Sequence, residues 1–132
     1  MKYSNNRDLV RHVFKTLFSS ELIELSVVER FFSKTYRQYA DGHQLNYEEF
    51  YLHLKKLKNE TKSLTIEFKA IAEQGSDVLT HHYVHLVKQD NSESLLEVLA
   101  HFQLEDGKIT GCWESCQVIS GSSSDHSFAY IQ

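Results

Sequence analysis

Apolar residues recur every three or four positions in the first sixty residues, which is the spacing of amphipathic helices. A first helix is predicted over about 6–18 and a second begins at Ser26, where Ser26 and Glu29 have the spacing of a capping box. A third helix follows another capping box, Asn46 to Glu49, and extends to about Lys58. Residues 34–39 either continue the second helix or turn extended.

From residue 63 the apolar period changes to two, as in strands with one buried face. Four strands are predicted, over about 63–73, 78–89, 95–105 and 108–119, with polar or Gly-containing turns between them. The pair Asp106-Gly107 is a strong hairpin signal. The residues from Gly121 on form a Ser-rich tail, in which 128–131 either add a short strand or do not.

Helices followed by a meander of strands predict an α+β fold, with three N-terminal helices packed on a curved antiparallel sheet. A length of 132 residues fits a single domain, 1–132, with an ordered core over about 6–119 and a tail over 120–132. The sheet face turned away from the helices carries several apolar side chains. Such a face favours a homodimer formed through it; its residues are Leu95, Leu99, Ile109 and Trp113.

The charge balance argues against a nucleic-acid partner. Fourteen basic and eighteen acidic residues give a net charge of −4, and the densest basic stretch, 55–58, fits a solvated helix face. No stretch approaches the ~18 apolar residues of a membrane span, and the N-terminal residues lack the apolar run of a signal peptide. Cys112 and Cys116 would lie about 13 Å apart in a strand, too far for a disulfide. We therefore expect a cytoplasmic protein with reduced thiols and no membrane partner.

Several short strings resemble the SnoaL-like branch of the nuclear transport factor two-like superfamily. The most specific is Phe102 to Ile109 followed by Trp113-Glu114; the others are Tyr36 to Gly42, Asn46 to Phe50 and Gly75 to Leu79. The resemblance implies a curled sheet and helices that enclose a cone-like pocket for a small apolar molecule. Members use such a pocket for isomerisation, cyclisation, dehydration or hydrolysis, or only for binding or dimerisation, so the fold does not fix the function.

The sequence departs from this family at positions that matter for chemistry. Relatives commonly carry His in place of Tyr39, an acidic residue in place of Ala100, and a His-Trp-Asp string where Cys112-Trp113-Glu114 stands. In catalytic members the acid on the third strand transfers protons. Ala100 cannot titrate, so that role does not carry over to this position.

Histidines crowd the second predicted strand at His81, His82 and His85, with His101 on the next. A metal needs ligands that converge within about 2.1 Å of one point. His81 and His85 share a face but lie about 13 Å apart, and His82 points the opposite way. We therefore expect no metal site, unless His101 brings the two strands together around an ion.

Two titratable residues are candidate catalytic groups. His82 has the parity of apolar neighbours, so it is either a general base that titrates near neutrality or a hydrogen-bonded core histidine. Glu114 is either an inward carboxyl with a raised pKa or a surface carboxylate, and strand parity does not decide between them.

The candidate ligand-binding residues are mostly aromatic or apolar. Tyr36 and Tyr39 either present hydroxyls to a ligand or pack between helices, and Trp113 is either a pocket wall or an anchor of the dimer. The remaining wall candidates are Phe68, Val84, Ala100 and Phe102. The sequence thus predicts a cofactor-free domain that binds a small apolar molecule. The alternative is a cofactor-free acid–base enzyme acting on a small apolar carbonyl compound, with His82 or Glu114 as proton carrier and Tyr39 as polarising donor.

Overall fold

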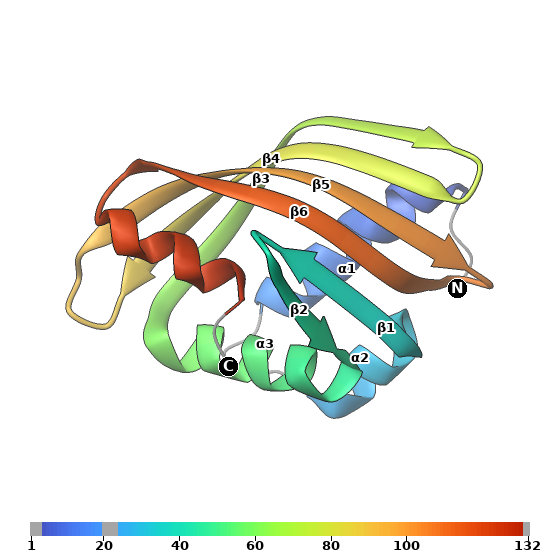
Figure 1. Cartoon of the computed structure of the whole chain (residues 1–132), viewed down its shortest axis with the longest axis horizontal. Helices are drawn as coiled ribbons and strands as arrows, with labels where there is room; N and C mark the ends of the chain where they lie inside the picture. The colour runs from blue at the N-terminus through green and yellow to red at the C-terminus, as the bar shows by residue number, and fades with distance from the viewer. Residues whose placement is uncertain (1–3, 20–23, 131–132) are drawn as a thin grey trace.

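The computed structural model describes residues 4–19 and 24–130, which form helices packed against one six-stranded sheet. The fold is α+β, and the long strands bend over α1 and α3 (Figure 1). In chain order the elements are α1 (Asn6–Ser19), α2 (Leu25–Phe31), β1 (Phe32–Ala40), β2 (His43–Asn46), α3 (Tyr47–Glu60), β3 (Thr61–Gln74), β4 (Asp77–Lys88), β5 (Glu93–Glu105), β6 (Lys108–Ser120) and the 3-10 helix η1 (Ser123–Ala129).

The sheet has the strand order β2-β1-β6-β5-β4-β3, and it is mixed rather than purely antiparallel. Strands β3 to β6 form the expected antiparallel meander, but β1 lies parallel to β6. Residues 34–39 are therefore extended, the second of the two alternatives that the sequence left open. This parallel pair brings the segment before the Asp41-Gly42 turn next to the last strand of the meander.

The core lies between the bent sheet and the helices. The alternating apolar face of β5, from Leu96 to Leu104, is buried throughout, as its pattern predicted. From α1 the side chains of Val10 and Val13 are fully buried, and α3 contributes Phe50 and Leu54. The burial of these side chains supplies the hydrophobic stabilisation of the fold. It also turns one face of every central strand toward the helices.

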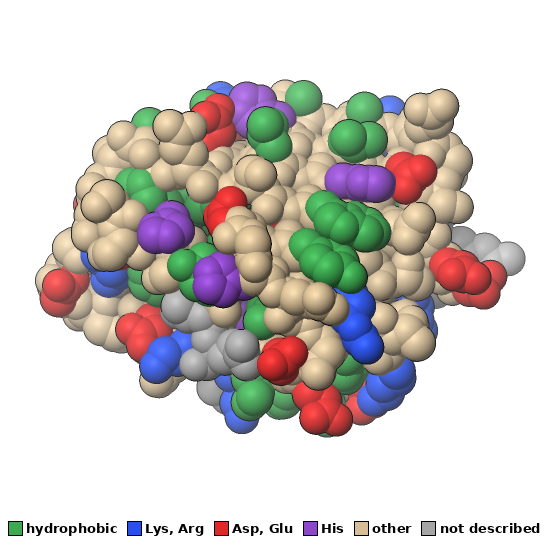
Figure 2. Space-filling view, in the orientation of Figure 1, with side chains coloured by type: hydrophobic (Ala, Val, Ile, Leu, Met, Phe, Trp, Pro, Cys, Tyr) green, Lys and Arg blue, Asp and Glu red, His purple; other side chains and the backbone are tan. Residues whose placement is uncertain are grey.

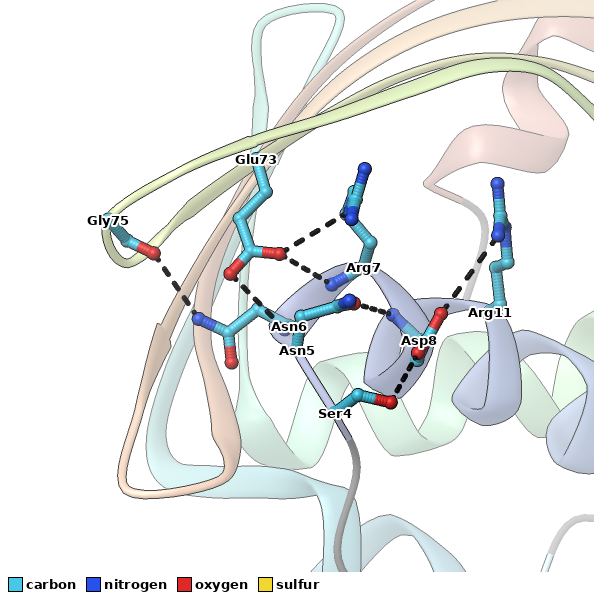
Figure 3. A network of polar contacts seen from close by, with 8 residues as sticks. All are labelled: Ser4, Asn5, Asn6, Arg7, Asp8, Arg11, Glu73 and Gly75. Atoms are coloured by element: carbon cyan, nitrogen blue, oxygen red, sulfur yellow. Dashed lines mark hydrogen bonds and ion pairs between the residues drawn. The ribbon is translucent and has the colours of Figure 1, made fainter.

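The start of α1 is fastened to the far end of β3 by one carboxylate. Glu73 accepts hydrogen bonds from the backbone amides of Asn6 and Arg7, both at 3.3 Å, and its side chain also pairs with the Arg7 guanidinium (Figure 3). The first amides of a helix have no partners within the helix and carry partial positive charge. A carboxylate from β3 therefore satisfies them and orients α1 across the sheet.

Helix starts agree with the sequence in one case and differ in another. The Asn46–Glu49 capping box of α3 is present, with both of its hydrogen bonds at 2.9 Å. The capping box predicted at Ser26 is wrong, because α2 begins at Leu25 after Glu24 and has no side-chain cap. This helix has only seven residues, and the buried Val28 and Phe31 hold it in place.

β-Bulges correct two of the parity assignments. The pairing of β5 with β6 shifts between Gln103 and Leu104, so Ile109 turns inward and is fully buried, although strand alternation had placed it on the opposite face. A second shift in the β3–β4 pairing leaves Ala70 and Ala72 exposed. A bulge adds one residue to a strand and reverses the side-chain alternation beyond it.

The chain after β6 folds back rather than trailing away. Gly121 has φ +108°, which L-residues rarely adopt, and η1 follows it with Phe128 and Ala129 buried. The sequence predicted a tail here, with or without a short strand at its end. The structure instead has a 3-10 helix at the end of the sheet near α3 (Figure 1). Within residues 4–19 and 24–130, no helix combines the length and the apolar character needed to cross a bilayer.

Candidate functional site

A cavity of about 90 Å³ lies between the inner face of the sheet, α1, α3 and η1. Its walls are mainly apolar or aromatic, from Phe14 and Leu17 on α1, Leu54 on α3 and Val98 and Phe102 on β5. A few polar side chains interrupt these walls: Tyr36, Gln38, His53, His82 and Glu114. Apolar walls with a small number of polar groups are typical of sites for small molecules.

Glu114 lies in a row of small residues on the inner face. In the register of the sheet it is opposite Ala100 on one side and Ala40 on the other, and Thr80 follows beyond Ala100. Ala40 and Ala100 are both buried, and neither can pack over the carboxyl. Among the described residues no hydrogen bond reaches that carboxyl. The position across from Ala100 thus holds a carboxyl group that is open to the cavity.

The environment of Glu114 favours its neutral form. Burial raises its pKa from 4.5 to about 8, and the nearby Asp41 carboxylate adds to the shift. Asp41 lies in the turn after β1, next to Glu114 of β6. Its amide donates to the Glu114 carbonyl at 3.3 Å, and its Oδ1 accepts from the Cys116 amide at 3.2 Å. Near pH 7 this carboxyl can therefore donate a hydrogen bond as well as accept one.

Tyr36 and Gln38 form a second polar feature of the cavity. Both lie on the inner face of β1, and the Tyr36 hydroxyl donates to Gln38 Oε1 at 2.8 Å. Burial raises the pKa of Tyr36 well above its usual value, with smaller contributions from Cys112 and Glu114. Tyr36 therefore acts as a neutral hydroxyl donor.

The two cysteines are free thiols that line the same cavity. Burial raises the pKa of Cys112 far above its usual value and that of Cys116 to about 12. A thiol is nucleophilic as the thiolate. Neither cysteine is therefore set up for nucleophilic catalysis.

His82 points inward and is almost fully buried. Its Nδ1 shares a hydrogen bond of 2.9 Å with Thr80, and its ring contacts Phe14 and Phe68. Burial, with a smaller effect from His81, lowers its pKa from 6.5 to about 4. His82 is consequently neutral near pH 7.

The predicted site residues divide between the two faces of the sheet. Tyr36, His82, Val84, Phe102 and Glu114 line the interior cavity. Phe68 packs behind them against the ring of Phe14, and Ala100 forms the gap beside Glu114. Tyr39 and Trp113 lie on the other face, where their rings stack at 5.4 Å. The structure thus separates Tyr39 from His82, whereas Glu114 lines both the interior cavity and a hollow on the outer side that Tyr39 also lines.

The outer face, defined by Tyr39, Leu79, Leu99, His101 and Trp113, combines apolar and polar side chains. Leu79, Leu99 and Trp113 are 51%, 59% and 41% exposed, and His101 stacks on Trp113 at 5.1 Å. Figure 2 shows hydrophobic side chains gathered over the β1–β6 part of the sheet, with His and acidic side chains beside them.

The crowded histidines are partners of carboxylates on the neighbouring strand. His81 pairs with Glu97 at 2.7 Å, His85 with Glu93 at 2.7 Å and His101 with Asp77 at 2.8 Å. In the described parts of the chain, no group of three or more His, Cys, Asp or Glu residues is arranged to hold a metal ion.

Gln38, Phe128 and Ala129 are among the contributors to the cavity that sequence reasoning missed. Gln38 has the same strand parity as Tyr36, a signal that was usable only once residues 34–39 were known to be extended. Phe128 and Ala129 reach the cavity from η1, and the apolar run after the Ser-rich segment was the available signal.

No protein-family model matches the chain. The uncharacterized protein C11D3.04c of Schizosaccharomyces pombe is 27% identical over 128 residues, which cover 97% of this chain and 98% of that protein. The solved structures that resemble the chain share less sequence but much of the backbone. A loop-truncation variant of IdmH from Streptomyces antibioticus, whose wild type is described as a polyketide cyclase, has a TM-score of 0.73 at 12% identity, with 85% and 92% of the two chains covered.

Two further structures agree. An epoxide hydrolase of the LEH-like type from M. tuberculosis matches with a TM-score of 0.71 at 15% identity, and the match covers 84% of this chain and 81% of that one. A protein assigned as a SnoaL-like polyketide cyclase from Jannaschia sp. CCS1 gives 0.66 at 12% identity, covering 88% and 90%. The chain has the SnoaL-like, NTF2-like fold. At these identities the likeness establishes the SnoaL-like fold and leaves the activity to be argued from the site.

Proposed function

We propose that this protein binds a small apolar molecule carrying one hydrogen-bonding oxygen in its interior cavity. The observation that carries the proposal is the Glu114 carboxyl, which faces an apolar cavity and has a pKa of about 8. The Glu114 side chain is half-buried and makes no hydrogen bond within the described residues, so a ligand oxygen in the cavity can accept a hydrogen bond from its neutral carboxyl. Glu114 stands across from Ala100 and takes the place of the acid that relatives carry there.

The dimensions of the cavity restrict the ligand. An engineered protein cavity of about 150 Å³ binds benzene. The interior cavity, about 90 Å³, is smaller. In the arrangement seen here it fits a compound of only a few carbon atoms, and a ligand the size of benzene or cyclopentanone requires a wall to move. Small ketones are therefore suitable probes.

Binding of cyclopentanone and of cyclopentane tests the proposal, because these probes differ mainly in the carbonyl oxygen. We expect saturation-transfer NMR to show about fivefold tighter binding of the ketone, the contribution of about one hydrogen bond. Glu114→Leu removes the donor and should abolish that preference, whereas Glu105→Leu, on the exposed hairpin end, is the matched control. Equal affinity of the native protein for both probes contradicts the proposal.

An acid–base enzyme is the second candidate, because a carboxyl with a pKa of about 8 titrates near the pH at which proton transfer is efficient. His82, with a pKa of about 4, is a weaker base. The ionised Glu114 would remove a proton from the carbon next to the ligand carbonyl and return it to the enolate. In D₂O this exchanges hydrogen for deuterium in the ketone. Exchange that Glu114→Gln abolishes favours the enzyme; no exchange favours a binding protein.

We further propose a homodimer formed through the outer face. Support comes from the exposed Leu79, Leu99 and Trp113 on a sheet surface that the described residues leave uncovered. Contiguous exposed apolar side chains often mark interaction surfaces. The two free thiols support a reducing compartment such as the cytoplasm.

A further inference from the structure

Part of the wall of the interior cavity is formed by η1. Phe128 and Ala129 contribute to the cavity wall, and each is only 9% exposed. The chain passes from β6 into η1 through a tight turn at Gly121. A Cβ added at Gly121 would lie 2.9 Å from the Glu93 carbonyl oxygen and closer still to the Ser94 side chain. One part of the cavity wall is thus a short segment that is joined to β6 at one sharp turn.

The root of this segment is firmly attached. Asp125 is buried, pairs with Lys88 at 2.9 Å and accepts a hydrogen bond from the Ser94 hydroxyl. If Asp125 moved away, the partly buried Lys88 ammonium and the buried Ser94 hydroxyl would lose their partner, which is destabilising. These two contacts fix the start of η1 to β4 and β5.

The described tip of the segment is held by contacts between neutral groups, one of them to a residue of the cavity wall. Gln38 Nε2 donates to the Ala129 carbonyl at 3.1 Å, while Gln38 Oε1 accepts from the Tyr36 hydroxyl. Beyond it, the Tyr130 ring stacks on His43 of β2 at 3.6 Å. One side chain therefore joins a polar group of the cavity wall to the tip of η1.

We propose that residues 126–130 form a lid that opens about Asp125, and that Gln38 is the latch through which a ligand controls it. Opening of the lid widens the access of a compound to the cavity, and its control by a ligand rests on the function proposed above. A ligand oxygen that accepts the hydrogen bond of Gln38 takes it from Ala129. Occupancy of the cavity and closure of the lid then compete for the same amide.

Labelling of Cys112 by a thiol reagent measures opening without any ligand. The thiol is 1% exposed and lines the cavity, so it reacts when the lid opens or the protein unfolds. In a Cys116→Ser background the full chain is compared with two variants. Gln38→Leu removes the hydrogen bond to Ala129, and Phe128→Ala removes the aromatic ring through which the lid contacts the cavity. Ile109→Val is the control, because Ile109 is buried in the core without lining the cavity.

We expect both lid variants to label at least about tenfold faster, the factor that corresponds to about 1.4 kcal/mol. The rate should stay independent of urea at low concentrations, as local opening exposes little surface. The control should label at the native rate. Unchanged rates in both lid variants, or rates that follow global unfolding, overturn the lid. A lid that opens while no ketone binds leaves this inference standing and rejects the proposed function, so the two failures are distinguishable.

Discussion

Glu114 carries a titratable carboxyl in a mainly apolar environment. Its ionisation therefore changes the free energy of unfolding. Its pKa is about 8 in the folded protein, against 4.5 for an unperturbed carboxyl. The folded state therefore holds the proton more tightly than the unfolded chain does. The contribution is fully present below pH 4.5 and is lost as the pH rises through 8.

The first prediction concerns Glu114→Gln, which keeps the size of the side chain and removes its charge. In the native protein we expect this group to lower the free energy of unfolding by on the order of 4 kcal/mol between pH 4.5 and pH 8. The variant should lose that decline. Urea unfolding at pH 5 and pH 8 measures both proteins, and an identical pH dependence would show that the carboxyl is solvated.

His82 has the opposite sign, because its pKa is lowered from 6.5 to about 4. The unfolded chain binds a proton at a higher pH than the folded protein does. Stability is therefore full above pH 6.5 and is lost as the pH falls through 4, by on the order of 3 kcal/mol. His82→Asn keeps a partner for Thr80 and should flatten the acid limb of the stability curve. If the acid limb of His82→Asn matches that of the native protein, this account of His82 is wrong.

For individual residues, the sequence identified His82 and Glu114 as candidate functional groups but did not establish what either does. Strand parity favoured an inward His82, whereas Glu114 remained undecided, since its neighbours on either face are a mixture of apolar and polar residues. What decides is the register, which sets Glu114 between Ala40 and Ala100. Register depends on pairing with β1, a strand that no local pattern marked.

Among the elements, α3 and the β5–β6 hairpin follow from local signals: a capping box and an Asp-Gly turn. The parallel pairing of β1 with β6 could not be predicted this way, because it joins segments more than seventy residues apart. Bulges defeat sequence reasoning for a related reason. The shift in the β5–β6 pairing turns Ile109 inward, and the alternation of apolar and polar residues does not indicate where such a shift occurs.

Gly121 tests the placement of η1. Its φ of +108° and the Ser94 side chain beside it leave no room for a Cβ. We expect Gly121→Ala to lower the free energy of unfolding by more than about 1 kcal/mol, through backbone strain and displacement of Ser94. Gly75→Ala, also at positive φ (+59°) but in open space, is the control for strain alone. If the two variants lose equal stability in thermal unfolding, the tight fit at Gly121 does not exist.

For the whole molecule, the outer face predicts assembly. Light scattering at micromolar concentration should give the mass of a dimer, and Leu99→Lys should give a monomer, because it places a charge where apolar side chains meet. Lys62→Glu, on the solvent side of β3, is a control for altered charge. A monomeric native protein would remove the outer face from the account and leave the interior cavity unaffected.

We expect a small ligand to enter the interior cavity rather than to bind the outer face of the sheet. Val98 and Leu99 are adjacent on β5 but point to opposite faces, with Val98 in the cavity and Leu99 59% exposed. A methyl-labelled NMR titration with cyclopentanone therefore separates the two locations in one experiment. We predict shifts at the Val98 and Val84 methyl groups with Leu99 and Leu79 unchanged. Shifts confined to Leu99 and Leu79, or none at all, would contradict the claim.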